Sequence, residues 1–580
     1  MRTPTGTSRP RPWSRSRYMG AVTAFGLALA VACGGAAAPT ATPTTRAAPT
    51  PTSASAQPTP TSAATLATAT PVRVAPTPTA QVVASRGKVV YAKPVDMGRA
   101  TSAAAGGAGG PDTPFASSIN AGLTNKGADG QLIPWLASSW AYSSSDTVLD
   151  ITLRKGAVFQ DGSPITVDDV LYSMNIWLNP ITPGVNKPTL PVLPSAIEKT
   201  GPDTFRVSFP RPDPFFLTAT FNTLSSAGEG WYIYPRAAVE RMGIDAFNKA
   251  PVAAGPYKLV KRLPGDSVLL EAHEQFFNGP PPVKTIDVRI APEDSTRVAM
   301  FRTGEADIVE SVAPQFLPDL EKLAGAKIFS TRTGQEVVIK IQTIPDKIPG
   351  TDRPNPFKDV RVRQAVSYAV DKKAIVERIA GRAGAPVKGP YSTYHLGAVP
   401  DKITDYDYNP EKAKQLLKDA NFPMDYQFPV YAYVASAPAP AAVEAYTNYL
   451  QAVGLKAQYR LVEVSSLIRL WNTKEAFPMS FVRSWNIYPD PSRHFVSFMK
   501  SDGGVSFVAD PVLDKTWEDA FKIADPAKQA QAYEKFFTYI HEQAYVVDLY
   551  AIVDNHGIGP KVDWRYPPGL PNSFNLITWR

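Results

Sequence analysis

The chain has 580 residues, of which 19% are charged and 10% aromatic, and a formal net charge of +8. This length allows three or four domains, and the apolar content is enough for a large packed core, which excludes a wholly disordered chain. Five arginines and no acids lie in residues 1–32, so removal of that segment lowers the net charge by five to +3. The basic character therefore belongs largely to the amino terminus, and we expect no nucleic-acid partner.

Residues 1–32 have the pattern of an export signal. A basic stretch precedes an apolar run from Met19 to Ala32, which is shorter than the roughly 20 residues that span a bilayer. The single cysteine, Cys33, follows a small residue at the end of this run, as in a bacterial lipobox, although Ala30 stands where Leu is usual. We expect lipidation of Cys33, and a plain signal peptide cleaved nearby is the alternative.

Residues 33–87 are predicted to form a disordered tether. The segment consists mostly of Pro, Thr and Ala and has few charges. Such a composition cannot bury enough apolar surface to offset the entropy of ordering the chain. In a polyproline II conformation some 50 residues would extend up to roughly 150 Å.

A strand, a turn and a helix are predicted between residues 148 and 179. Leu149, Ile151 and Leu153 alternate with polar residues, which is the period of a half-buried strand. The stretch 161–164 (DGSP) is typical of a turn. Thr166 with Asp169 three residues later predicts a capped helix start.

Further elements follow the same rules along the chain. Alternating residues predict strands at 88–94, 204–209, 267–271, 285–290 and 480–482, and helical spacing predicts helices at 295–302, 359–379, after Asn409-Pro410 and after Asp525-Pro526. The helix at 359–379 is expected to be one continuous amphipathic segment, with Arg361 and Arg363 as surface residues near its start. Asn421 is expected to end the helix that begins at Pro410.

The sequence carries no recognisable catalytic or metal-binding motif. The five histidines have no metal-ligand spacing, and the chain has no HExxH, CxxC, GxSxG or Walker sequence. We expect each histidine to be a surface or interdomain residue. Glu305 and Asp307 follow Gly304 and are expected in a solvated turn. The chain is therefore not expected to be an enzyme or to need a cofactor or a metal.

Several sequence blocks together resemble one known family. PWLASSW (134–140) is followed by LRKGAVFQDGSPITVDDV (153–170), then by PVAAGPYKL (251–259), STRVAMFRTGEADI (295–308) and FKDVRVRQAVSYAVDKKAIV (357–376). In content and order these blocks resemble the ABC-type extracellular solute-binding proteins of family 5, which include oligopeptide-, dipeptide- and nickel-binding proteins. The resemblance extends from about Lys88 to the carboxyl terminus.

The resemblance implies an α/β fold of the two-lobed periplasmic-binding-protein type (type II), with an additional third domain and mixed sheets flanked by helices. Domain I would be discontinuous and comprise residues 88–134, 248–345 and 545–580. Domain II would comprise 135–247, and domain III 346–544. Gly255, Pro256 and Tyr257 would form a junction between domains.

The resemblance also implies a ligand-binding loop in residues 479–495 (MSFVRSWNIYPDPSRHF). Trp485 would form a stacking wall, while Arg483, Asn486, Tyr488 and Asp490 would supply hydrogen bonds or charge. Peptide-binding members have an acid three residues after the Trp, and this chain has Tyr488 there. A buried ammonium group without a carboxylate partner is costly, so a sugar or an uncharged peptide-like compound fits as well as a peptide.

The function that the resemblance implies is capture of a small solute outside the cell and its delivery to an ABC permease with its ATPases. The protein would act as a monomer, anchored to the outer face of the membrane through Cys33. A receptor that passes its ligand to a membrane sensor is one alternative. A surface-anchored hydrolase is another, although the sequence offers no nucleophile for it.

Overall fold

The computed structural model describes residues 85–96, 113–127, 132–179, 192–219, 232–390, 395–433, 438–485, 491–523, 525–566 and 573–580. The predicted export signal, Cys33 and the predicted tether up to residue 84 lie outside this part of the chain.

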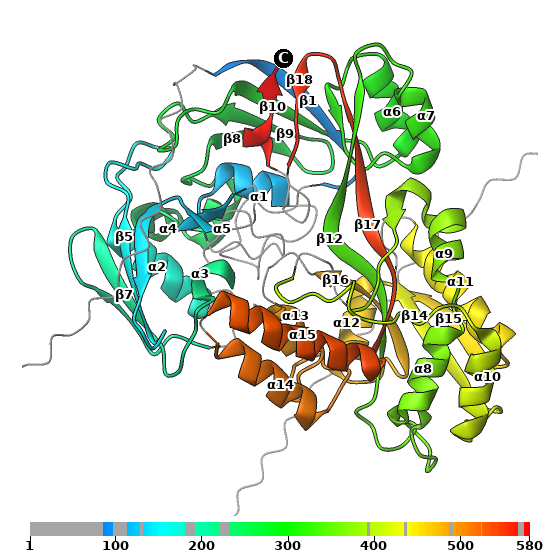
Figure 1. Ribbon diagram of the computed structural model, residues 1–580. Helices are drawn as coiled ribbons and strands as arrows, with labels where there is room; N and C mark the ends of the chain where they lie inside the picture. The colour runs from blue at the N-terminus through cyan, green and yellow to red at the C-terminus, as the bar shows by residue number, and fades with distance from the viewer. Residues whose placement is uncertain are drawn as a thin grey trace, which may run out of the picture. The chain divides into compact units, whose positions relative to one another are not determined.

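One mixed sheet holds eleven of the described strands (Figure 1). Its order is β15-β14-β16-β12-β17-β11-β1-β10-β9-β8, and β13 pairs with β17 off this path. The strands are β1 (Arg86–Lys93), β8 (Tyr257–Leu263), β9 (Ser267–Ala272), β10 (Val283–Ile290), β11 (Ile308–Val309), β12 (Lys327–Ile341), β13 (Gly384–Ala385), β14 (Gln427–Tyr433), β15 (Lys456–Val462), β16 (Met479–Trp485) and β17 (Val546–Ile558).

Two long strands, β12 and β17, join the two halves of this sheet (Figure 1). They pair antiparallel from Lys327↔Ile558 to Lys340↔Val546. The carboxyl end of β17 also pairs with β11, whereas the second half of β12 pairs with β16. The ladder shifts register between Arg332 and Glu336, where Gly334 has a φ of +74°. A positive φ is favourable for glycine, so the irregularity is built into the sequence.

The two faces of β12 are covered by different helices. Val337, Ile339 and Ile341 lie in a core with α8 (Val360–Tyr368), α10 (Pro410–Asp419) and α11 (Ala439–Ala452). Val338 lies in another core, with α13 (Ser492–Phe498), α14 (Pro511–Phe521) and α15 (Pro526–Glu542). Because successive residues of a strand point to opposite faces, this strand is buried on both sides.

A separate antiparallel sheet has the order β4-β5-β7-β6 and packs against α2 (Val167–Leu178). Its strands are β4 (Ala137–Tyr142), β5 (Val148–Leu153), β6 (Ala196–Lys199) and β7 (Thr204–Ser208). The Thr166 side chain caps α2, and the Asp169 side chain accepts the backbone N–H of Thr166 at 3.0 Å. The predicted strand and capped helix are thus confirmed.

The remaining elements are short or peripheral. The helices are α1 (Thr113–Ile119), α3 (Phe216–Ala219), α4 (Arg236–Met242), α5 (Ile244–Lys249), α6 (Asp294–Arg302), α7 (Leu317–Leu320), α9 (Lys372–Ile375) and α12 (Val464–Asn472). Single turns lie at Pro314–Phe316, Pro356–Lys358, Val376–Ala380, Gly381–Ala383 and Phe574–Leu576. The small sheets pair β2 (Thr124–Lys126) with β3 (Leu132–Pro134) and β18 (Val562–Asp563) with β19 (Thr578–Trp579).

The prediction of one continuous helix at 359–379 is wrong. Helix α8 ends at Tyr368, and Asp371 caps a new helix by accepting the backbone N–H of Ala374 at 2.8 Å. An aspartate side chain competes with the helical backbone in this way and favours a new start. By contrast, Asn421 has a φ of +51° after α10, as predicted.

Two predictions of exposure are also wrong. Arg361 is exposed as expected, but Arg363 is buried, and its guanidinium donates to the carbonyls of Phe357, Lys358 and Gln543 at 2.7–2.9 Å. Burial is possible because these carbonyls replace the hydrogen bonds of water. Four histidines, His273, His395, His494 and His556, are buried and not on the surface, and their location between domains stays a prediction.

Candidate functional site

The predicted ligand loop lies only partly in the described residues. Arg483 and Trp485 belong to β16, so Trp485 is the last residue of a strand and not part of a loop. Asn486, Tyr488 and Asp490 lie outside the described residues. The roles assigned to these five residues remain predictions.

Strands β14 and β16 end at the same edge of the sheet. They pair in parallel through Val430↔Met479 and Tyr431↔Ser480, so their carboxyl ends point the same way. In open α/β sheets, ligands bind beyond the carboxyl ends of the strands. The edge formed by the ends of β14 and β16 is hereafter called the carboxyl edge, and it is the candidate site.

Aromatic side chains support Arg483 at the carboxyl edge. The ring of Tyr433, the last residue of β14, stacks on Phe481 with centroids 4.8 Å apart. The backbone of Arg483 hydrogen bonds to the Tyr433 hydroxyl. Because residues i and i+2 of a strand share a face, Arg483 follows Phe481 on the face that Tyr433 covers.

The Arg483 side chain is half-buried, and its Nε atom is removed from water. Burial lowers its pKa, and the opposing influences come from Tyr433, Asp554 and Tyr550. Within the described part of the chain, its Nε has no hydrogen-bond partner. A buried cation of this kind is costly unless an anion or further acceptors are present.

The opposite face of β12 carries a second buried set of charges, which the sequence reasoning missed. Glu336 and Lys340 are 0% and 1% exposed, and Asp548 of β17 lies opposite Val338 between them. Burial, with Asp548 adding to it, raises the pKa of Glu336 well above its usual range. Burial raises the pKa of Asp548 to about 7 and lowers that of Lys340 to about 7. The signal was available, because Lys340 interrupts the apolar run 337–341 and Glu336 stands directly before it.

The predicted junction at Gly255 is tightly packed. Gly255 donates its N–H to the carbonyl of Ile119 at 2.9 Å, and a Cβ at this glycine would lie 2.4 Å from the carbonyl carbon of Ile119. The buried amide of Gln160 donates to the carbonyls of Ile119 and Tyr257 at 2.9 and 2.6 Å. Only glycine fits this approach of two backbones. The role of Gly255, Pro256 and Tyr257 as a hinge stays a prediction.

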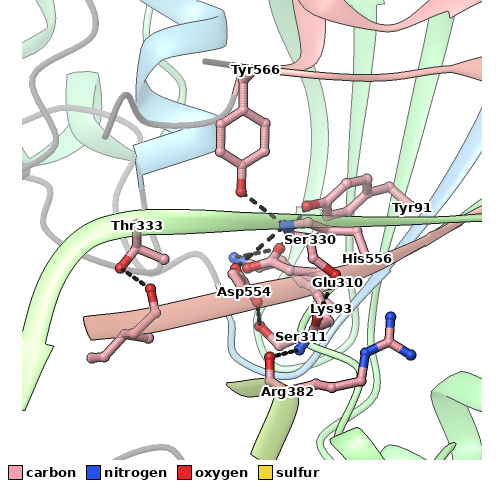
Figure 2. A network of polar contacts seen from close by, with 12 residues as sticks. Tyr91, Lys93, Glu310, Ser311, Ser330, Thr333, Arg382, Asp554, His556 and Tyr566 are labelled. Atoms are coloured by element: carbon pink, nitrogen blue, oxygen red, sulfur yellow. Dashed lines mark hydrogen bonds and ion pairs between the residues drawn. The ribbon is translucent and has the colours of Figure 1, made fainter. Parts of the chain in front are cut away.

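A polar network surrounds the region where β12, β17 and β1 lie together (Figure 2). Tyr91 donates its hydroxyl hydrogen to Glu310 at 2.8 Å, and Ser311 donates to Asp554 at 3.0 Å. The Nε2 of buried His556 lies 2.8 Å from the hydroxyl of Tyr566. These contacts fix the segment after β11 and the end of β17 relative to the sheet.

The described residues of the candidate site offer binding groups: the ring of Tyr433 and the side chain of Arg483. Among the described residues, no group of three or more His, Cys, Asp or Glu could hold a metal ion. Aromatic rings with a few polar groups are what a solute-binding pocket requires. In the same part of the chain, no helix has both the length and the apolar character needed to cross a membrane.

Comparison with known proteins identifies the family. Residues 131–506 match the model of the "Bacterial extracellular solute-binding proteins, family 5 Middle". The chain is 30% identical to heme-binding protein A of Haemophilus influenzae over 51% of this chain and 54% of that protein. It is 23% identical to the oligopeptide-binding protein AppA of Bacillus subtilis over 77% of this chain and 82% of the relative.

A solved structure shows the same fold. The periplasmic binding protein DppA of Helicobacter pylori, in complex with the peptide STSA, superposes with a TM-score of 0.73 at 19% identity, over 85% of this chain and 98% of that chain. The fold is therefore the α/β type II periplasmic-binding-protein fold with mixed sheets flanked by helices. Members of the family bind solutes and are not enzymes. The chain belongs to the bacterial extracellular solute-binding proteins of family 5.

Proposed function

We propose that this protein captures a small extracellular solute at the carboxyl edge and delivers it to an ABC permease with its ATPases. The observation that carries the proposal is the shared edge of the parallel strands β14 and β16, with Tyr433 and Arg483 at it. The names of the relatives, which include heme- and oligopeptide-binding proteins, support a small organic solute.

Capture would occur by closure of two lobes around the solute. The strands β12 and β17 join the two halves of the sheet, and their register shift near Gly334 is a place where the ladder can flex. The closed form would be favoured because the solute contacts both lobes only there. A decrease in radius of gyration on solute addition, measured by small-angle X-ray scattering, tests this closure. An unchanged radius at saturation contradicts it.

Trp485, Asn486, Tyr488 and Asp490 would contact the solute together with Arg483. Because Tyr488 stands where peptide-binding relatives of the family carry an acid, a free amino group would not be a required feature of the solute. Replacement of Tyr488 by Asp should raise the affinity for a tripeptide with a free amino terminus. The affinity for the same peptide with an acetylated amino terminus should not rise.

The protein would act outside the cell, anchored to the membrane through lipidated Cys33 and held at a distance by the tether that precedes β1. The family description, which names extracellular proteins, supports the location. Mass spectrometry of the amino-terminal peptide from the membrane fraction tests the anchor. A diacylglyceryl modification of Cys33 supports it, and an unmodified peptide that begins elsewhere contradicts it.

The binding function is tested with solutes recovered from the protein itself. Purified protein is denatured, and the released small molecules are identified by mass spectrometry and then titrated into solute-free protein. Saturable binding of a released compound supports the proposal. Release of nothing, together with no binding across a library of peptides and sugars, contradicts it.

A further inference from the structure

A pair of aromatic rings connects two parts of the chain that β12 and β17 join through the backbone. The first part (described residues of 85–326) carries β1, β8 to β11 and the sheet β4-β5-β7-β6, and the second part (described residues of 342–545) carries β14 to β16 and α8 to α15. Phe215, directly before α3, and Phe521, the last residue of α14, have ring centroids 5.8 Å apart. Because only side chains take part, this contact can break when the two parts move while the strands stay paired.

The segment around Phe215 is fixed to the first part. Phe215 donates its N–H to Asp213 Oδ1 at 3.1 Å, and Asp213, which is 2% exposed, donates its own N–H to the carbonyl of Asp146 at 3.0 Å. The next residue, Phe216, is buried and packs edge to face on Phe209 with centroids 5.0 Å apart. Phe215 is half-buried, and its ring reaches the second part.

Phe521 belongs to a row of rings in the second part. It is 0% exposed and its ring lies 5.2 Å from that of Trp517, which in turn lies 5.2 Å from that of Phe495. Phe216 of the first part and Phe521 of the second part are members of one hydrophobic core, and Phe215 packs against this core. Separation of the two parts would therefore expose apolar rings to water, which is unfavourable.

We propose that Phe215 and Phe521 form an aromatic latch, which holds the two parts together and sets how tightly a captured solute is retained. The ring contact favours the closed arrangement with or without a solute. A solute then has to supply less of the free energy of closure, so its apparent affinity rises with the closed fraction. This inference rests on the proposed binding function and adds a pair of residues, remote in sequence from the predicted ligand loop, that regulates it.

The size of the effect follows from the strength of an aromatic pair. Such a pair shifts an equilibrium between two states by about 2- to 12-fold. Phe215→Ala should therefore lower the ratio of closed to open protein by about this factor. The rate at which a bound solute dissociates should rise by a similar factor, because opening precedes release.

The distance between two spin labels tests the latch in full-length protein freed of bound solute. Glu198 of β6 and Lys515 of α14 are exposed, and Glu198→Cys with Lys515→Cys provides one label on each part, in protein that also carries Cys33→Ser. Pulsed electron spin resonance should resolve a shorter and a longer distance. The ratio of the shorter to the longer population should fall about 2- to 12-fold in Phe215→Ala. Identical distance distributions with and without this substitution overturn the inference.

Further variants assign the effect to the ring pair. Phe521→Leu keeps most of the apolar volume and should shift the populations in the same direction, and Phe215→Ala should add little in Phe521→Leu protein, because the two rings act as one contact. The matched control is Tyr426→Ala, since Tyr426 is also half-buried and its ring lies 5.6 Å from that of buried Phe428 within the second part. A shift in the control as large as in Phe215→Ala overturns the inference. Should Phe215→Ala fail to fold, Phe215→Leu decides by the same measurement.

Dissociation rates separate the latch from the binding function itself. Release of trialanine, and of any compound recovered from the purified protein, is followed by stopped-flow fluorescence. Release should be about 2- to 12-fold faster in Phe215→Ala, with little change in the association rate. An unchanged dissociation rate overturns the latch and leaves the binding function intact. Binding of none of these compounds contradicts the proposed function, and the label distances in solute-free protein then decide the latch alone.

Discussion

Gln160 holds three separate segments together through one buried amide. Its Nε2 donates to the carbonyls of Ile119, Gly255 and Tyr257 at 2.9, 3.3 and 2.6 Å, and its Oε1 accepts the N–H of Ala253 at 3.1 Å. Replacement by Leu keeps a similar volume but removes all four hydrogen bonds. We therefore expect Gln160→Leu to destabilise the protein strongly.

The size of the destabilisation by Gln160→Leu depends on which backbone groups keep a hydrogen-bond partner. The carbonyl of Ile119 still accepts from the Gly255 N–H, and the carbonyl of Gly255 lies 3.2 Å from the His273 ring. The Ala253 N–H loses its acceptor, and the Tyr257 carbonyl loses a donor. At about 1–3 kcal/mol for each buried unsatisfied group, the free energy of unfolding should fall by about 2–6 kcal/mol.

Urea unfolding followed by tryptophan fluorescence measures this loss. The control is Gln415→Leu, since Gln415 is exposed on α10 and makes one side-chain hydrogen bond, to Asp419 at 2.7 Å. The control should change the free energy of unfolding by no more than about 0.5 kcal/mol. Equal effects of the two substitutions would refute the reasoning that the buried amide is the source of stability.

Three further substitutions test other parts of the account. Gly255→Ala should lower the free energy of unfolding by about 1–3 kcal/mol, because the new Cβ would collide with the backbone of Ile119. The control Gly504→Ala should be neutral, because a Cβ there meets nothing within 4 Å. Equal urea midpoints for the two variants would contradict this. Burial raises the pKa of Asp548 from 3.8 to about 7. Between these two pH values the folded protein keeps the carboxyl proton and the unfolded chain loses it. The free energy of unfolding therefore falls as the pH rises from about 4 to about 7. Asp548→Asn should therefore stabilise more at pH 7.5 than at pH 5, and an equal gain at both would speak against the shifted pKa. Trp485→Ala should weaken solute binding at least about tenfold by calorimetry without a change in melting temperature, and unchanged affinity would remove Trp485 from the site.

Local signals in the sequence predicted much of the fold. Thr166 and Asp169 defined the start of α2, and Asn421 defined the end of α10, because capping depends on neighbouring residues alone. The break at Asp371 was missed, since an aspartate on a polar helix face and an aspartate that caps a new helix look alike in the sequence.

The site was harder to predict because burial depends on distant segments. Arg363 was expected on the surface, but Gln543, which lies 180 residues away, supplies a carbonyl that allows its burial. The charges of Glu336 and Asp548 come together only through the pairing of β12 with β17. The family resemblance predicted Arg483 as a binding residue. Its position near Tyr550 could not be predicted, because it depends on the pairing register of β16, β12 and β17.

The central claim is that this protein binds a small solute and leaves it chemically unchanged. The most direct measurement is calorimetric titration of the solute-free protein with the solute released from it, followed by mass spectrometry of the recovered compound. We expect saturable one-to-one binding and recovery of the same compound. No saturable binding, or conversion of the compound into another, would contradict it.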